Sequence, residues 1–244
     1  MDLLYLESYI LLDNINGETM DVCIILPTYN EEDSIEELIH KIKEVNSTYK
    51  ILVVDSNSTD ATIRLARMCN VDILLVRDKR GKGHAIHETF KKLNYEYVIL
   101  LDSDLSYSPE EIPEFIKQLD KYDIVSGSRF LGIIEKDSIS SINMIGNIII
   151  TIIGTKLFNV KSTDICTGFW GFRKSVYTKM IIDAPHFELE ANFFTEILRN
   201  KLNYCEIPIS YKKRVGTSKI NVLDGIRIVL YLIKRRLWNG MECD

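Results

Sequence analysis

The sequence predicts an α/β protein with a mostly parallel sheet flanked by helices. From residue 22 to residue 119, short apolar runs alternate with segments of helical periodicity, which is the pattern of parallel strands joined by helices. The run at residues 97–101 is apolar or aromatic throughout, as is typical of a strand buried on both faces. It stops at Asp102, Ser103 and Asp104, so two carboxylates follow a buried strand at the edge where open α/β sheets bind ligands.

The first half of the chain is predicted to contain four strands, each followed by a helix. The strands are expected at residues 22–26, 50–54, 73–76 and 97–101. The first helix covers residues 35–45, where apolar residues recur on one face, and the second ends at about Cys69. The third follows a basic loop with two glycines, residues 77–83. The fourth begins at Pro109, because proline is favoured in a first helical turn, and ends near Leu119.

The second half of the chain is less regular. The expected elements are a strand at 123–126 that runs into Gly127-Ser128-Arg129, an apolar helix at 142–158, a helix at 187–199, a strand at 204–210 and a helix at 221–238. Residues 164–173 are rich in glycine and aromatic residues, and no element is assigned to them. The last helix has an apolar side (Val222, Ile226, Val229, Ile233 and Leu237), with Arg227, Lys234 and Arg235 elsewhere. It either lies in a lipid interface or packs on the core.

The charge of the chain is distributed unevenly. The formal net charge is -5, but residues 1–40 contain no Lys or Arg, and residues 211–238 contain eight against the single acid Asp224. A basic end on an acidic protein indicates an anionic partner, such as a phosphate group or a membrane surface. The alternative is a solvated helix face. We expect no nucleic-acid partner.

Composition also suggests where the protein works. The five cysteines are scattered and have no C-x-x-C spacing, which is typical of reduced thiols in a cytosol-facing protein. The amino terminus lacks the basic region of a signal peptide. Residues 144–160 are the most apolar window, but Asn, Thr and Lys interrupt it, so we do not expect it to span a bilayer alone.

The acidic pair is the first candidate site. Two carboxylates one residue apart repel each other and lose hydration, and a divalent cation offsets both costs. The alternative is that Asp102 and Asp104 are turn and cap residues, because Asp is common after strands. The loop at 77–83 is a weaker candidate, since its glycines let backbone N–H groups approach an anion. A dinucleotide fingerprint after the first strand and a P-loop motif are both absent from the sequence.

Eight segments together resemble a known family. In chain order they read LPTYNE (26–31), VVDSNSTDAT (53–62), GKGHA (81–85), LDSDLSYSPE (101–110), GSRF (127–130), TGFWGFR (167–173), FELE (187–190) and R-x-G-x-S-K (214–219). The sequence resembles the glycosyltransferases of family 2, in the branch that includes dolichyl-phosphate mannosyltransferase. The resemblance implies a Rossmann-like GT-A fold over residues 21–221, after an extension at 1–20 and before a basic amphipathic helix and tail at 222–244.

The resemblance also implies roles for single residues. For the nucleotide sugar, the implied binding residues are Pro27, Tyr29, Glu31, Asp55, Lys82 and Asp102. Asp102 and Asp104 would bind Mg²⁺ or Mn²⁺. The acceptor phosphate would be held by Arg129, Arg214, Ser218 and Lys219. Catalysis is assigned to Asp104, Arg129 and Glu190, and Glu188 would line the sugar or acceptor side with Glu190.

The sequence departs from the family pattern at three places. Ser56 stands where a second Asp often follows Asp55, and Ser106 stands where a polar residue such as Gln is frequent. Asn143 and Met144 stand where an Arg often precedes a Gly-Asn pair. The chain also lacks the trailing membrane spans of several relatives and the Q-x-x-R-W pattern of processive synthases.

The function implied is that of an inverting hexosyltransferase. It would move a hexose from GDP-mannose, UDP-glucose or UDP-N-acetylglucosamine to dolichyl or polyprenyl phosphate, as a peripheral protein on the cytoplasmic face of a membrane. One alternative is a family 2 enzyme with a sugar or protein hydroxyl as acceptor, which needs a carboxylate base such as Glu190 or Asp164. The other alternative is a GT-A module without enzymatic activity.

Overall fold

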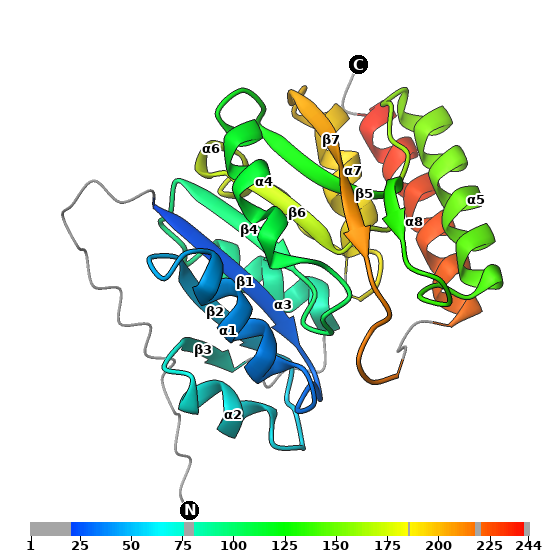
Figure 1. The fold of residues 1–244 in the computed structure, drawn as a ribbon. Coiled ribbons are helices and arrows are strands. Elements are labelled where there is room, and N and C mark those ends of the chain that lie inside the picture. The colour runs from blue at the N-terminus through cyan, green and yellow to red at the C-terminus, as the bar shows by residue number, and fades with distance from the viewer. Residues whose placement is uncertain (1–20, 76–80, 185, 218–220, 242–244) are drawn as a thin grey trace, which may run out of the picture.

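A computed structural model of the chain describes residues 21–75, 81–184, 186–217 and 221–241. It contains one seven-stranded sheet with helices on both faces (Figure 1). The extension expected at residues 1–20 lies outside the described residues, and so do two predicted phosphate-binding residues, Ser218 and Lys219.

The sheet is mostly parallel, as predicted. Its strand order is β3-β2-β1-β4-β6-β5-β7. The bounds are β1 Val22–Thr28, β2 Lys50–Asp55, β3 Asp72–Leu75, β4 Tyr97–Leu101, β5 Ile124–Ile134, β6 Phe169–Arg173 and β7 Tyr204–Tyr211. Strand β6 runs antiparallel to β4 and β5, whereas the other paired strands of the sheet are parallel.

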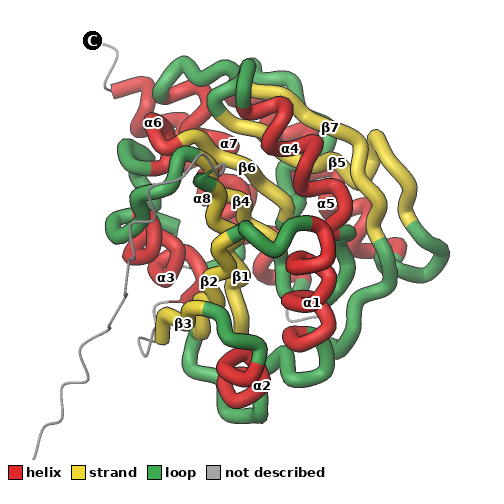
Figure 2. The backbone as a smooth tube through the Cα atoms, turned by 60° about the vertical axis from the view of Figure 1, so that its left-hand side comes forward, coloured by secondary structure: helices red, strands yellow, loops and turns green. Residues whose placement is uncertain are grey.

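The helices form two layers, because alternate residues of each strand point to opposite faces. One layer contains α1 (Ile35–Val45), α2 (Thr62–Met68), the short 3₁₀ helix η1 (Pro109–Glu111) and α4 (Ile112–Leu119). The other contains α3 (Gly81–Phe90), α5 (Ser141–Phe158), α6 (Lys174–Tyr177), α7 (Leu189–Arg199) and α8 (Val222–Met241). On β1, Ile24 and Leu26 belong to the first core, and Cys23 and Ile25 to the second. Figure 2 shows the strands between α1 on one side and α3 on the other.

Two glycine-rich segments differ from the sequence expectation. The strand expected at 123–126 continues as β5 through Gly127 to Ile134, beside β7. A Cβ atom at Gly132 would lie 1.9 Å from the carbonyl oxygen of Ile209, so this glycine marks a close approach of two strands. Residues 169–173, to which no element was assigned, form β6 in the middle of the sheet.

The C-terminal helix is present, and it has two different sides. Ile228, Tyr231 and Leu232 of α8 are buried in the core shared with α5 and α7. Four of the five residues on the predicted apolar side are exposed: Val222, Ile226, Ile233 and Leu237. Arg235, which the sequence places off the apolar side with Arg227 and Lys234, is fully buried and forms an ion pair with Glu196 of α7.

Candidate active site

The carboxyl ends of β1, β2 and β4 meet at one edge of the sheet. Thr28 pairs with Asp55 at the ends of β1 and β2. The hydroxyl group of Ser103, between the two acidic residues, donates to the carbonyl oxygen of Pro27 at 2.9 Å and lies 3.2 Å from the hydroxyl of Thr28. These bonds fix the turn that carries the acidic pair to the end of β1.

Asp102 shares one cation with a second carboxylate. Lys82 Nζ lies 2.7 Å from Asp102 Oδ1 and 2.8 Å from Glu190 Oε1. Lys82 is the second residue of α3, and Glu190 is the second residue of α7. Burial opposes the charge on Lys82, but the two carboxylates outweigh it and raise its pKa. Burial also raises the pKa of Glu190, although Lys82 acts against this. The lysine therefore joins three elements at the site.

Asp104 is held by its own turn and by the loop after β7. Its Oδ1 accepts the Ser106 N–H at 3.0 Å, and its Oδ2 lies 2.7 Å from Arg214 NH2. The loop follows the turn closely, because the Val215 N–H donates to the Asp104 carbonyl at 2.9 Å and the Lys212 N–H to the Ser106 carbonyl at 2.8 Å. The basic loop predicted from the sequence is thus placed on the acidic pair.

Gly168, just before β6, packs directly against Asp102. A Cβ atom built on Gly168 would lie 2.0 Å from Asp102 Oδ2 and 2.4 Å from its carboxyl carbon. The Gly168 N–H donates to the hydroxyl of Tyr107 at 2.7 Å, which holds the backbone in this place. Any larger residue at position 168 must displace the carboxylate of Asp102. The sequence marks this segment by its glycines and aromatic residues and by the family resemblance, but none of these signals predicts the contact of Gly168 with Asp102.

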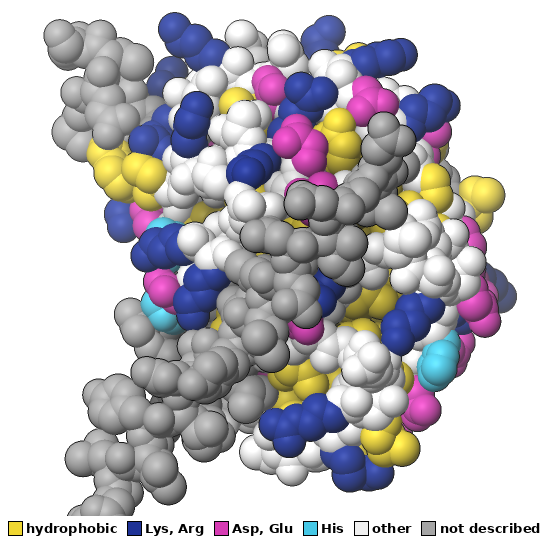
Figure 3. All heavy atoms as spheres, turned by 90° about the vertical axis from the view of Figure 1, so that its left-hand side faces the viewer, with side chains coloured by type: hydrophobic (Ala, Val, Ile, Leu, Met, Phe, Trp, Pro, Cys, Tyr) yellow, Lys and Arg dark blue, Asp and Glu magenta, His cyan; other side chains and the backbone are white. Residues whose placement is uncertain are grey.

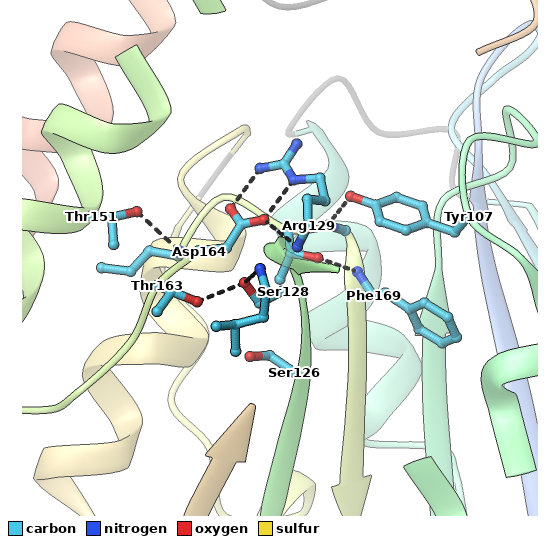
Figure 4. Close-up of polar contacts among 12 residues, drawn as sticks. Tyr107, Ser126, Ser128, Arg129, Thr151, Thr163, Asp164 and Phe169 are labelled. Carbon is cyan, nitrogen blue, oxygen red and sulfur yellow. Dashed lines mark hydrogen bonds and ion pairs between the residues drawn. The ribbon is translucent and has the colours of Figure 1, made fainter. Parts of the chain in front are cut away.

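Arg129 and Asp164 form a buried bidentate ion pair (Figure 4). Arg129 Nε and NH2 lie 2.6 and 2.7 Å from the two oxygens of Asp164, and the Arg129 N–H donates to the same carboxylate at 3.1 Å. The guanidinium also lies 5.2 Å from the ring centre of Tyr211. Burial opposes the charge on Arg129, but Asp164 outweighs it and raises the arginine pKa well above its ordinary value. Asp164 is therefore engaged as a charge partner.

The ends of β1 and β2 continue the same edge. Asp55 is buried, and its carboxylate accepts the Ser58 N–H at 3.0 Å. The ring of Tyr29, directly after β1, is 46% exposed. It offers a flat surface at the same edge as the loop that follows Asp55. The Glu31 N–H donates to the Thr62 hydroxyl at 2.8 Å, so the turns after β1 and β2 are bonded to each other.

The family follows from the sequence comparison. Residues 23–181 match the family model described as glycosyl transferase family 2. The chain belongs to this family. It is 28% identical over 224 residues to glycosyltransferase AglJ of Haloferax volcanii. The aligned region covers 90% of this chain and 73% of that protein. It is 27% identical over 244 residues to dolichol-phosphate mannosyltransferase of Pyrococcus furiosus. This alignment covers 91% of this chain and 65% of that protein.

Solved structures place this family 2 chain in the predicted GT-A fold. Glucosyl-3-phosphoglycerate synthase from Mycobacterium tuberculosis, in complex with Mn²⁺, UDP and glucosyl-3-phosphoglycerate, matches with a TM-score of 0.70. The match covers 90% of this chain and 80% of that chain at 17% identity. At this identity the likeness shows the fold, and the predicted fold class is confirmed.

The family 2 site brings most of the predicted residues together. Ion pairs join Lys82, Asp102 and Glu190 in one group and Asp104 and Arg214 in a second. Pro27, Tyr29, Glu31 and Asp55 lie further along the same edge. Glu188 is buried and accepts the His186 N–H at 3.3 Å. The guanidinium of Arg129 is bound to Asp164 instead of to the acidic pair.

The donor atoms of the acidic pair suit a hard divalent cation. The two carboxylates of the turn after β4 offer oxygen ligands, which Mg²⁺ and Mn²⁺ prefer. Asp102 is half-buried and Asp104 is buried, so both carboxylates are partly removed from water. Both carboxylates already have cationic partners in the protein, which shows that the site accommodates positive charge. The residues present therefore fit the metal that the fold family implies.

Proposed function

We propose that the protein transfers a hexose from a nucleoside diphosphate sugar to a polyprenyl phosphate, with Mg²⁺ or Mn²⁺ at the acidic pair. The observation that carries the proposal is the meeting of two carboxylates with Lys82 and Arg214 at the carboxyl edge of the sheet. Such a site suits a metal-bound diphosphate, because the metal takes the carboxylates and the phosphates take the cations. The Mn²⁺ and UDP in the fold neighbour, and the dolichol phosphate in the name of a relative, support this choice.

On the donor side, Asp102 and Asp104 would hold the metal ion. A metal bound there would neutralise the negative charge that develops on the leaving diphosphate. Lys82 would donate to the diphosphate from the start of α3, where the helix terminus also favours an anion. The nucleoside would lie toward Tyr29 and Asp55, where an exposed aromatic ring stands beside a buried carboxylate.

On the acceptor side, a phosphate oxygen would attack the anomeric carbon. The bond from that carbon to the diphosphate breaks, and the nucleoside diphosphate leaves with the electron pair. Attack from the opposite face inverts the configuration, so an α-linked donor gives a β-linked product. A phosphate is an anion at neutral pH, and no base has to remove a proton from it. The pairing of Asp164 with Arg129 and of Glu190 with Lys82 supports this mechanism, since both carboxylates considered as bases are engaged.

The acceptor phosphate would be held by polar and basic residues of the second half of the chain. Arg214 Nε is buried and has no hydrogen-bond partner among the described residues, so the guanidinium retains a donor for an incoming oxygen. Arg129 is bound to Asp164 and lies against Tyr211, so we assign it to the framework behind the phosphate site and not to the phosphate contact itself. Ser218 and Lys219 follow on the same segment of the sequence.

We propose that α5 and α8 lie on the cytoplasmic surface of a membrane, where a polyprenyl chain would be anchored. The two helices lie side by side (Figure 1) and share a core. Their outer sides expose large apolar residues: Ile142, Ile145, Ile148, Ile149 and Ile152 of α5, and Val222, Leu223, Ile226, Leu230, Ile233 and Leu237 of α8. By contrast, the face at the left of Figure 1 shows separate hydrophobic side chains among charged ones (Figure 3). An apolar face of this extent marks an interaction site.

The charge and length of these helices support a surface position. Arg227, Lys234 and Arg236 are exposed on α8, where they would meet anionic lipid headgroups. Helix α5 is also long and apolar enough to cross a membrane by length and composition, with 18 residues and a mean hydropathy of 1.5. Its Ile150, Thr151, Gly154 and Phe158 are nevertheless buried against the domain, which favours a helix that lies on the lipid.

The donor is tested by thermal unfolding with Mn²⁺ and GDP, UDP, CDP or ADP. A ligand that binds the folded state raises the midpoint, by about 2.7 kcal/mol of stability at a hundredfold excess over its dissociation constant. We expect a shift with GDP or UDP that Asp104→Ala abolishes and Asp72→Ala preserves. Asp72 is a matched control, because it also forms a 2.7 Å ion pair, with Lys50. No shift with any of the four nucleotides would contradict the proposal and favour a module without activity.

The acceptor is tested by transfer of labelled sugar from the nucleotide so identified. We expect transfer to polyprenyl phosphate, none to polyprenol, and a β-linked product. Transfer to a sugar or protein hydroxyl instead would favour the alternative acceptor class. An α-linked product would exclude direct displacement by the phosphate.

The membrane surface is tested by co-sedimentation with vesicles of phosphatidylcholine and phosphatidylglycerol. We expect Ile226→Glu and Leu230→Glu to abolish binding, because each places a charge on the apolar face of α8. Met68→Glu is the matched control, since Met68 is equally exposed but lies on α2. Equal loss of binding in the control would contradict the role assigned to α8.

A further inference from the structure

Two cations of the chain bind the carboxylates that a metal ion would need. Lys82 Nζ lies 2.7 Å from Asp102, and Arg214 NH2 lies 2.7 Å from Asp104. The two cations come from different parts of the fold, Lys82 from the start of α3 and Arg214 from the loop after β7. A divalent cation and these side chains therefore compete for the same oxygens.

Each of the four carboxylate oxygens has a neighbour in the protein. Asp102 Oδ1 binds Lys82, and Asp102 Oδ2 lies against the backbone of Gly168. Asp104 Oδ1 accepts from Ser106, and Asp104 Oδ2 binds Arg214. Neither carboxylate can turn away to a free position without losing a bond or meeting the backbone. Because each carboxylate oxygen has two lone pairs, an incoming cation either shares these oxygens with Lys82 and Arg214, close to their charges, or displaces them.

Displacement by a cation alone is unfavourable. The Lys82 and Arg214 side chains are only 20% and 25% exposed, so each would lose an anionic partner while still partly removed from water. The incoming ion would also stand close to a displaced positive charge, and like charges in a partly buried site repel strongly. Glu190 would retain Lys82 at 2.8 Å, which keeps this charge near the site.

A diphosphate changes this balance. It brings anionic oxygens together with the metal, and these can accept the hydrogen bonds that Lys82 and Arg214 give up. Arg214 is prepared for such an exchange, because its Nε is buried and lacks a hydrogen-bond partner among the described residues. Glu190 would act as a positioning residue, because it keeps Lys82 within reach of both Asp102 and the diphosphate.

We propose that Lys82 and Arg214 couple the binding of the metal to that of the nucleoside diphosphate. A free divalent cation binds the acidic pair weakly, whereas the metal and the diphosphate bind tightly together. The two side chains act as internal counter-ions of the acidic pair and then as ligands of the diphosphate. This inference rests on the proposed function, since it concerns the metal and nucleotide of that same site.

The experiment measures Mn²⁺ binding directly, from the electron paramagnetic resonance signal of free Mn²⁺. Mn²⁺ is titrated into the full chain alone and with saturating UDP or GDP. We expect the nucleotide to tighten Mn²⁺ binding by tenfold or more, within the range of about 5- to 150-fold usual for coupled sites. Lys82→Met and Arg214→Met should each tighten the binding of Mn²⁺ alone and weaken its binding with nucleotide, so that the coupling falls by about tenfold.

Lys50→Met is the matched control. Lys50 forms an ion pair of the same 2.7 Å length with Asp72, away from the acidic pair, and its removal should leave the coupling unchanged. Urea unfolding establishes that each variant is folded. If Lys82→Met fails to fold, two results decide the question by the same criteria. These are the effect of Arg214→Met on the coupling and the ratio of the wild-type Mn²⁺ affinities with and without nucleotide.

The possible results separate this inference from the proposed function. Mn²⁺ that binds the wild type equally well with and without nucleotide overturns the coupling but leaves a metal-dependent transferase in place. Coupling that survives in both Met variants overturns the role of the two side chains. Failure of the wild type to bind any nucleotide with Mn²⁺ overturns the proposed function and this inference together.

Discussion

Two kinds of ion pair in this molecule have the same chemistry and different surroundings. Arg129 and Asp164 are separated by 2.6 Å, with 6% and 0% of their side chains exposed. Lys82 and Asp102 are separated by 2.7 Å, with 20% and 32% exposed. The bond lengths do not distinguish the pairs. Access to water and to an incoming ligand distinguishes them. A buried ion that has lost its partner costs far more free energy than an unpaired ion at the edge of the sheet.

The difference separates framework from site. Arg129 with Asp164, and Arg235 with Glu196, hold segments together inside the fold. Lys82 and Arg214 hold the acidic pair at the edge where a ligand would enter. One observable, the free energy of unfolding in urea, should rank substitutions in the two sets.

The largest loss is expected for Asp164→Ala. It leaves Arg129 buried without its partner, and such losses are about 3–5 kcal/mol. Urea unfolding followed by circular dichroism measures it. The double variant Arg129→Met with Asp164→Leu is the control, since it removes both charges and should regain most of the stability. A loss under about 1 kcal/mol for Asp164→Ala would place this pair with Lys82–Asp102 and Arg214–Asp104, whose partners an incoming ligand can replace.

A similar but smaller loss is expected for Glu196→Ala. Arg235 is fully buried and loses its main partner, but Asp183 remains 3.6 Å from its NH1. We expect about 3 kcal/mol, the lower end for a broken buried pair. The same urea experiment measures it, with Glu114→Ala as control, because Glu114 pairs with Lys117 at the surface. Equal effects of the two substitutions would contradict a framework role for Arg235.

Gly168→Ala should have an intermediate effect on stability and a larger one on ligand binding. The added Cβ meets Asp102 Oδ2 at 2.0 Å, and overpacking of this kind costs about 1–3 kcal/mol. Displacement of Asp102 should also weaken Mn²⁺–nucleotide binding, measured by calorimetry. Gly146→Ala is the matched control, since a Cβ there meets nothing within 4 Å, and alanine in a helix gains about 0.5–1 kcal/mol over glycine. Unchanged nucleotide binding in Gly168→Ala would show that Asp102 tolerates movement.

The smallest loss of stability is expected for Lys82→Met. Lys82 also pairs with Glu190, which is 11% exposed, so we expect about 1 kcal/mol, the upper end for partly exposed pairs, and the methionine side chain fills most of the space of the lysine. Urea unfolding measures it beside Asp164→Ala. A loss as large as that of Asp164→Ala would identify Lys82 as framework, and the distinction between the two kinds of pair would fail.

The sequence predicted the first half of the fold better than the second. Strand β4 has the predicted bounds, because its uninterrupted apolar run is buried on both faces. Strand β6 was missed because Gly168 and Gly171 interrupt its pattern. A Cβ on Gly171 would lie 3.1 Å from Ile99 Cδ1, so the side chain of the neighbouring strand leaves little room there. The same cause hid the length of β5, where glycines permit close approach to β7.

The candidate site was predicted as a set of residues and not as a set of contacts. The position of Asp102 and Asp104 followed from the end of a buried strand, and Lys82, Glu190 and Arg214 from the family resemblance. Their pairing depends on three elements that the sheet brings together, which spacing along the chain does not reveal. The sequence signalled Gly168 only as part of a glycine-rich segment, and the burial of Arg235 ran against its position in a basic helix.

The strand order also dictates how the chain can fold as it leaves the ribosome. Among the described strands, β5 pairs only with β6 and β7, which both come later in the sequence. Strand β7 begins at Tyr204, 70 residues after β5 ends at Ile134 (204 − 134). At a synthesis rate of roughly 5–20 residues per second, β5 waits several seconds for its second partner. During that interval β1 to β4 can already associate, whereas β5 has two open edges until β6 is made and one open edge until β7 is made, so aggregation of nascent chains should concentrate there.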